Sequence, residues 1–518
     1  CGRPSKGCHA CRRRKTKCDA APNGCTQCKN AGRTCPGYRS QIDMMFRDQS
    51  EKLAKIAKTN QRAVHSSNDR DSTPEAVQVA DFPGSGPTAT LSEPVEETAT
   101  CFFMVNFAGG MTVPGVDGIV FAGHETTKPQ TWPYPTETLD DILKTSLEAT
   151  SLACLANHAR QQRLNDMAQS HYVKAINLTN QALSNDGAKK DSVLLSVNLL
   201  ALFETISGLS KRSMKATADH VRGAAALLQL RGMGQFESSL GRQAFLHTAH
   251  NLLMSCLQWN IRLPEHIIRM TEDFLKETRQ PARRARLFMA MLDFTQFRYD
   301  VRRGGRVTGL QDIVKGALQI DAAFSDFCDH PDEMAQYDEF TDNSLRSDLV
   351  HDGHYHVYRQ VEEARVWNHV RIFRITIHQL ICESLLASAT LSKPEYEPQF
   401  QQSTIICKNL SADLVASIPQ QLGLVNNTVT WRHSDDDLSN LFAGSTPRPH
   451  LCGYPLLWPL WIAAAVPTAT HGTRAYCTGI LDLIGSQMGI KHALVLARLL
   501  REMKNFTVAI WTDDRIDF

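Results

Sequence analysis

The stretch "CHACRRRKTKCDAAPNGCTQCKNAGRTC", residues 8–35, holds six cysteines among seven lysines and arginines. The cysteines form two copies of the spacing C-x2-C-x6-C, which are Cys8, Cys11, Cys18 and then Cys25, Cys28, Cys35. A C-x2-C pair lets two sulfurs bind one tetrahedral zinc ion, and a short intervening helix returns the third sulfur. A repeat of this kind predicts a metal-binding module rather than scattered thiols.

The number of ligands indicates how the metal is shared. Two separate tetrahedral zinc sites need about eight ligands, and this segment offers six thiols. His9 is the only histidine before His65, and it lies inside the first C-x2-C loop, where it cannot easily join the same ion. The count closes if two thiolates each bridge both ions. A two-histidine finger lacks its histidine pair, a RING-type site lacks ligands, and a redox pair does not explain the second copy.

The cysteine repeat, the loop with Pro22 and the basic run "RRRKTK" resemble the fungal binuclear zinc cluster, in which six cysteines hold two zinc ions. The resemblance implies that the first and fourth cysteines are the bridging ligands, which here are Cys8 and Cys25. One Zn²⁺ would then have four ligands: Cys8, Cys11, Cys18 and Cys25. The other would have Cys25, Cys28, Cys35 and Cys8.

The basic residues are distributed unequally between the two halves of the repeat. Five of them lie between the second and third cysteines: Arg12, Arg13, Arg14, Lys15 and Lys17. The equivalent part of the second half has only Lys29 and Arg33. Five closely spaced cations repel one another unless a polyanion neutralises them. The first half is therefore predicted to read DNA, while the second supports the fold and touches phosphates, although a solvated basic face or a nuclear localisation signal remains an alternative.

The resemblance also suggests which residues read bases. In the family, the two basic residues three and four positions after the second cysteine approach a CGG triplet, and here these are Arg14 and Lys15. Arginine and lysine commonly contact O6 and N7 of guanine in the major groove. Lys15 is the residue expected to contact a base, and Arg12, Arg13 and Lys17 are expected to contact phosphates.

Charge and composition divide the chain in the same way. Residues 1–62 have 15 Lys and Arg against four Asp and Glu, so the remainder is acidic although the total charge is only +2. A basic head on an acidic body indicates binding of a polyanion. No secretory signal or membrane span is visible, because the apolar stretch 455–467 is too short and contains Pro459. Disulfides are therefore not expected, and metal explains the cysteines better.

The segment after the cysteines is predicted to form a short amphipathic helix and then a linker. Between residues 40 and 63, apolar residues recur at three- and four-residue steps over about two heptads, with Gln49 in the middle. The stripe is too short for a stable zipper, so docking on the body is an equal alternative to dimerisation. Residues 64–98 are rich in Ser, Thr, Pro, Asp and Glu, which is typical of a flexible linker.

Residues 99–518 are predicted to form a large all-α domain. Together with the small zinc-cluster domain at 1–39, this makes the predicted fold class mainly α. Helical periodicity favours a helical pair at 171–183 and 191–206, a helix at 219–232 ended by Gly232, and a buried helix within 455–467. The pattern H-x2-GA-x2-LL-x-LRG, followed by QF and GR-x2-F, resembles the fungal-specific transcription factor regulatory domain, as does "LLWPLWIAA" followed by "MGIKHALVLARLL".

No catalytic motif accompanies these features: the body has no nucleophile elbow, P-loop, HExxH or dinucleotide fingerprint. The segment "HDGHYH" (351–356) is interpreted as a polar loop, with metal binding as the alternative. We expect a nuclear, zinc-dependent transcription factor that binds double-stranded DNA with CGG-like triplets. Its body is expected to contact coregulators or an effector and to form any homodimer. A DNA-tethered enzyme is one alternative, but it would need a reactive pocket in the body, for which the sequence offers no candidate. A zinc-buffering protein is the other, and it does not explain the unequal arginines.

Overall fold

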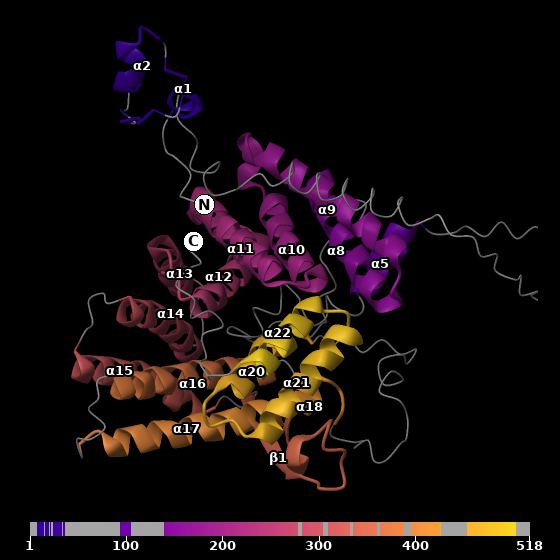
Figure 1. Cartoon of the computed structure of the whole chain (residues 1–518), viewed down its shortest axis with the longest axis vertical. Coiled ribbons are helices and arrows are strands. Elements are labelled where there is room, and N and C mark those ends of the chain that lie inside the picture. Colours follow the sequence, from indigo (N-terminus) through magenta and orange to yellow (C-terminus); the bar gives the residue numbers. More distant parts are fainter. Residues whose placement is uncertain are drawn as a thin grey trace, which may run out of the picture.

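The computed structural model describes the following residues: 8–14, 16–19, 21, 24–33, 35–36, 94–104, 139–277, 282–303, 309–331, 335–359, 363–387, 395–425 and 453–503 (Figure 1). The amphipathic helix predicted at 40–63 and the linker up to residue 93 lie outside this part of the chain. None of the described helices is long and apolar enough to cross a membrane.

The described residues form two separate hydrophobic cores. One consists of cysteines of the N-terminal module. The other is a continuous cluster that runs from Ala99 to Ala497 and includes the aromatic side chains of Phe203, Phe373 and Trp461. The prediction of a small cysteine module followed by a large, mainly helical body is confirmed.

The first helices of the body pack on α8 and α10. Their bounds are α5 Val95–Phe103, α8 Asp141–Ala159, α9 Gln162–Leu183, α10 Asp191–Ser207 and α11 Lys211–Arg231. Both α9 and α10 pack extensively on α8. The predicted helical pair also meets directly, because the ring of Tyr172 stacks on that of Phe203 with centroids 4.2 Å apart.

Helix α5 begins inside the range predicted as linker. Pro94 precedes it, and Glu96 and Glu97 lie in its first turn, where carboxylates favour the positive end of the helix dipole. Ala99 and Phe103 are buried in the body core. Helix α5 therefore runs across the boundary predicted at residue 98.

The middle of the body contains longer helices and one hairpin. Their bounds are α12 Ser239–Trp259, α13 Glu265–Glu277, α14 Ala282–Arg302, α15 Leu310–Asp329, β1 Tyr337–Thr341, β2 His354–Tyr358, α16 Glu363–Ala387, α17 Glu397–Ala416 and α18 Ile418–Gln421. Helix α16 is buried along most of its length and packs against both α15 and α17 (Figure 1). A buried ion pair between Arg284 and Glu363, 3.0 Å apart, joins α14 to the start of α16.

The prediction of a polar loop at 351–356 is wrong, because this segment forms part of a β-hairpin. Residues His351–Gly353 form a 3-10 turn, η6, and His354–Tyr358 form β2, which pairs antiparallel with β1. Tyr and Val in β2 favour a half-buried strand. The positive φ values of Asp352 and Gly353, 51° and 67°, turn the chain into that strand.

The C-terminal helices return to the first part of the body. They are α20 Leu457–Ala465, α21 His471–Ser486 and α22 Lys491–Glu502. Asn157 on α8 donates from Nδ2 to the carbonyls of Ile206 and Gly489 at 2.9 and 2.7 Å. His492 on α22 lies 3.2 Å from the hydroxyl of Ser213 on α11. These contacts connect residues far apart in the sequence into one core.

The sequence pattern that resembles the regulatory domain consists of packing residues. Gly232 has φ 62° and ends α11, as predicted. Gln235 donates from Nε2 to the Gly232 carbonyl at 2.7 Å, and Arg242 donates to the Phe236 carbonyl at 2.6 Å. The rings of Phe236 and Phe245 meet edge to face, 4.9 Å apart. The pattern therefore fixes the turn between α11 and α12.

Candidate zinc and DNA-binding module

The two halves of the cysteine repeat have the same backbone hydrogen bonds. Helix α1 spans His9–Arg13 and helix α2 spans Thr26–Asn30. The backbone N–H of Cys11 donates to Cys8 Sγ at 3.4 Å, and that of Cys28 donates to Cys25 Sγ at 3.3 Å. After each helix the chain turns back through one bond, from the N–H of Thr16 to Cys11 O and from that of Arg33 to Cys28 O, both 3.0 Å.

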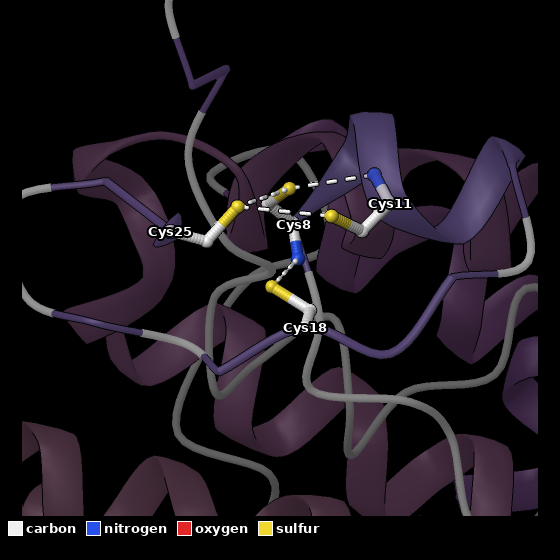
Figure 2. A group of neighbouring side chains, drawn as sticks. All are labelled: Cys8, Cys11, Cys18 and Cys25. Atoms are coloured by element: carbon white, nitrogen blue, oxygen red, sulfur yellow. Dashed lines mark hydrogen bonds between the residues drawn. The ribbon is translucent and has the colours of Figure 1, made fainter. Parts of the chain in front are cut away.

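The six sulfurs lie together in two overlapping groups. One group contains Cys8, Cys11, Cys18 and Cys25, and the other contains Cys8, Cys25, Cys28 and Cys35. Within each group the sulfurs lie within 4.8 Å of one another. Figure 2 shows the first group, with the sulfurs turned toward one another between α1 and the start of α2. Cys8 and Cys25 belong to both groups.

The spacing between sulfurs fits a tetrahedral metal site. A Zn–S bond of about 2.3 Å gives sulfur–sulfur edges of about 3.8 Å in a regular tetrahedron. Cys8 Sγ lies 3.6 Å from Cys25 Sγ and 3.7 Å from Cys28 Sγ, and Cys11 Sγ lies 3.7 Å from Cys25 Sγ. Thiols this crowded cannot all ionise unless a cation is present, because thiolates repel one another.

The chemical environment of the thiols agrees with this reading. Cys8 and Cys25 are fully buried, Cys11 and Cys28 are nearly so, and burial raises the pKa of Cys25 above its usual range. For Cys28, the contact with Cys25 lowers the pKa, but burial and the neighbouring Cys8 raise it, and the result is about 11. Without metal the sulfurs of Cys25 and Cys28 would hold their protons at neutral pH, so metal binding there requires proton release.

Two residues that the sequence analysis did not single out hold the halves together. Asp19 follows Cys18 directly, and its carboxylate accepts from the backbone N–H of Thr26 at 3.1 Å and from the Thr26 hydroxyl. The bond to Thr26 lowers the pKa of Asp19. Gly24 has φ 95°, and a Cβ there would lie 3.1 Å from Cys35 Cβ. Asp19 lies seven residues before the start of α2, and this spacing does not by itself indicate that its side chain caps the helix.

The described basic side chains of the module lie on its surface. Arg13, Arg14 and Lys17 from the first half are exposed, as are Lys29 and Arg33 from the second. The backbone of Arg12 lies in α1, but its side chain is outside the described part, and Lys15 is outside it altogether. The predicted base contact by Lys15 therefore stays a prediction.

A serine–histidine–aspartate arrangement occurs in the body, although the sequence showed no catalytic motif. His378 lies 3.1 Å from Ser403 Oγ through Nδ1 and 3.2 Å from Asp321 Oδ2 through Nε2. Ser403 is fully buried, and Asp321 also accepts two bonds from Arg374 at 2.9 and 3.0 Å. A substrate cannot reach a serine without exposed surface, so these residues join α15, α16 and α17 as a polar core network.

Comparison with known proteins gives one match in the cysteine head and one in the first part of the body. Residues 6–43 match the fungal Zn(2)-Cys(6) binuclear cluster domain, and residues 129–278 match the fungal specific transcription factor domain. No curated protein and no solved structure matches the chain. Both matching families are transcription factor domains rather than enzymes. Residues 6–43 are therefore similar to a zinc-binding, DNA-binding domain, and residues 129–278, in the first part of the helical body, are similar to a domain of fungal transcription factors.

Proposed function

We propose that this transcription factor acts in the nucleus on RNA polymerase II promoters, and that its head holds two zinc ions through six cysteines. The observation that carries this proposal is that Cys8 and Cys25 belong to both groups of four sulfurs. Two shared thiolates allow six cysteines to satisfy two tetrahedral ions. The terminal ligands would be Cys11 and Cys18 for one ion and Cys28 and Cys35 for the other.

The cysteine head positions its basic residues through this core. Bound zinc would neutralise the crowded thiolates and supply folding energy to a segment whose described core consists largely of sulfur. The chain itself fixes the start of α2 through the bond between Asp19 and Thr26. Helix α1, which carries Cys11, Arg12 and Arg13, is thereby held against α2.

DNA recognition is proposed to depend on the first half of the repeat. Arg14 and Lys15 would read a CGG-like triplet in the major groove, where bidentate contacts to guanine discriminate between bases. Phosphate contacts, which position a protein without reading sequence, are assigned to Arg12, Arg13, Lys17, Lys29 and Arg33. The exposure of Arg13, Arg14 and Lys17 supports this arrangement.

The helical body is proposed to regulate the head by binding coregulators or an effector. It is also the proposed site of any homodimer, because apolar side chains remain exposed on α16 and α17: Leu386 is 54% exposed and Ile405 is 52% exposed. Sedimentation of the full chain, with and without a duplex that carries two triplets, tests this. A chain that stays monomeric on its own and on the duplex would contradict the homodimer.

The main test is selection of bound sites from random double-stranded DNA by the full chain. Recovery of sites with one or two CGG-like triplets supports the proposal and reports their spacing. The same selection with Lys15→Ala should lose the preference while keeping salt-sensitive binding. If no sequence is enriched although the zinc is bound, the zinc-buffering alternative is favoured instead.

A further inference from the structure

The β1–β2 hairpin brings together three side chains of metal-binding type, none of them in the cysteine head. Glu339 lies opposite His356 in the strand register, and Thr341 lies opposite His354. Side chains two residues apart on a strand share a face, so both histidines and Glu339 are on the same side of the hairpin. Their ligand atoms all lie within 4.8 Å of one another.

One of these side chains has a buried atom without a partner. His356 is fully buried, and its Nε2 has no hydrogen-bond partner among the described residues. The other ring nitrogen, Nδ1, lies 3.3 Å from the Tyr358 hydroxyl and 3.4 Å from the Arg371 guanidinium. Buried polar atoms in folded proteins are nearly always paired, with protein groups, water or ions. The unmatched Nε2 therefore points to a ligand that the protein atoms do not supply.

The surroundings of the histidines resemble the outer contacts of metal sites. A metal-binding histidine usually has its second ring nitrogen held by a hydrogen-bonding neighbour, which orients the ring. His356 Nδ1 has the Tyr358 hydroxyl in that position, and His354 Nδ1 lies 3.4 Å from Thr341 Oγ1. The two imidazole rings are perpendicular, at 89°, with centroids 5.4 Å apart.

The local charge is compatible with a cation despite the nearby Arg371. That guanidinium is stacked over Tyr337 and Trp367 at 5.3 and 5.2 Å, and it also donates to the Tyr358 hydroxyl at 2.6 Å. The carboxylate of Asp413 opposes its single charge, and Glu339 adds a second negative charge near Asp413. Burial raises the pKa of Asp413, Arg371 partly offsets this, and the nearby charge of Glu339 raises the pKa further. A divalent ion would relieve the repulsion between the two carboxylates.

We propose that Glu339, His354 and His356 bind one divalent transition-metal ion in the helical body. Two imidazoles and one carboxylate are a ligand set that zinc accepts, with a fourth position left for water. Such an ion cross-links β1 to β2 beside α17 and α18, on which β2 packs. The site lies beyond residue 278, where the match to the fungal domain ends, and it makes the body itself sensitive to zinc.

The experiment measures bound zinc per full-length chain by elemental analysis, after dialysis in a zinc-buffered solution. Glu339→Gln and His354→Ala should each bind one zinc ion fewer than the unchanged chain. Asp338→Asn is the matched control, because this exposed residue neighbours Glu339 but points to the opposite face of β1. The readout is a difference between variants, so it does not depend on how many ions the cysteines hold.

A second measurement guards against loss of zinc through misfolding. The thermal midpoint of the body, followed by circular dichroism, should rise with added zinc in the unchanged chain and in Asp338→Asn. It should not respond in Glu339→Gln, whose exposed side chain can be replaced without disturbing the core. Equal zinc content in all these folded proteins, with equal thermal response, would overturn the proposed site.

Discussion

The sulfurs of Cys8 and Cys25 lie 3.6 Å apart, and each belongs to both four-cysteine groups of the head. The other four cysteines belong to one group each. Both shared residues are fully buried. They stand at equivalent positions of the repeat, and the sulfur of each accepts a hydrogen bond from the backbone N–H three residues later. This asymmetry of roles leads to a direct prediction about substitution.

Replacing a shared cysteine should remove more zinc than replacing a terminal one. Cys8→Ala or Cys25→Ala deletes a ligand of both proposed ions, so the head should lose both zinc ions together with its fold. Cys35→Ala deletes a ligand of one ion and should retain the other. Native mass spectrometry of the full-length variants counts the ions. Equal losses in all three variants would contradict the bridged arrangement.

Replacing a base-reading residue should act differently from replacing a phosphate-contacting one. Lys15→Ala should cost about 1–3 kcal/mol at the selected site and leave binding to random DNA almost unchanged. Arg12→Ala should weaken binding to both kinds of DNA alike and reduce the salt dependence by about one ion. Fluorescence anisotropy at several salt concentrations measures both effects. Parallel losses on both DNAs for Lys15→Ala would show that it contacts phosphate.

The grouping of the six cysteines and most helices could be predicted because their signals are local. Cysteine spacing encodes the ligand set within a few turns of chain, and periodic apolar residues encode the helices. The buried helix predicted within 455–467 is also confirmed as α20, in which Trp458 and Trp461 are 8% and 1% exposed. Each of these features depends on residues that are close together in the sequence.

Features that depend on distant pairing were missed for the same physical reason. The β1–β2 hairpin has no tight two-residue turn, because Asp342–Gly353 separates its strands, so no turn signal marks it. Ser403, His378 and Asp321 come from three helices, and only packing brings them together. The base contact expected of Lys15 is a different case, since it lies outside the described residues.

The buried carboxylate of Asp321 should be essential for the stability of the body. It accepts two bonds from Arg374 and one from His378, which hold α15 against α16. Asp321→Asn would leave the Arg374 charge without its partner, and breaking a buried pair of this kind costs about 3–5 kcal/mol. Urea unfolding followed by circular dichroism measures the change.

The matched control for this substitution is Asp329→Asn, which changes an exposed aspartate on the same helix. Its effect should stay within about 0.5 kcal/mol, as is usual for surface positions. If Asp321→Asn were equally mild, the network would contribute little to stability. The negative charge of Asp321 would then not be needed for the stability of the body.

Mild acid should destabilise the body through its buried histidines. Burial lowers the pKa of His220 to about 4 and that of His492 to about 3, whereas the unfolded value is about 6.5. Below that unfolded value the unfolded chain binds protons that the folded chain does not, so stability falls as the pH drops. The loss contributed by these two histidines should begin near pH 6.5 and continue toward their folded pKa values of about 4 and about 3.

The test compares urea midpoints at pH 7.5, 6.5 and 5.5. These values bracket the histidine pKa of about 6.5 in the unfolded chain. His492→Gln should show a smaller loss between the two lower pH values, because the buried ring that resists protonation beside Ser213 is gone. His330→Gln, at an exposed position on the surface, should behave like the unchanged chain. Burial raises the pKa of the Glu204 and Asp413 carboxyls, so these groups make the folded chain more stable as the pH falls. The readout is therefore the difference between variants in how the urea midpoint changes with pH. Identical slopes for all three proteins would mean that His492 is protonated without unfolding the contact between α22 and α11.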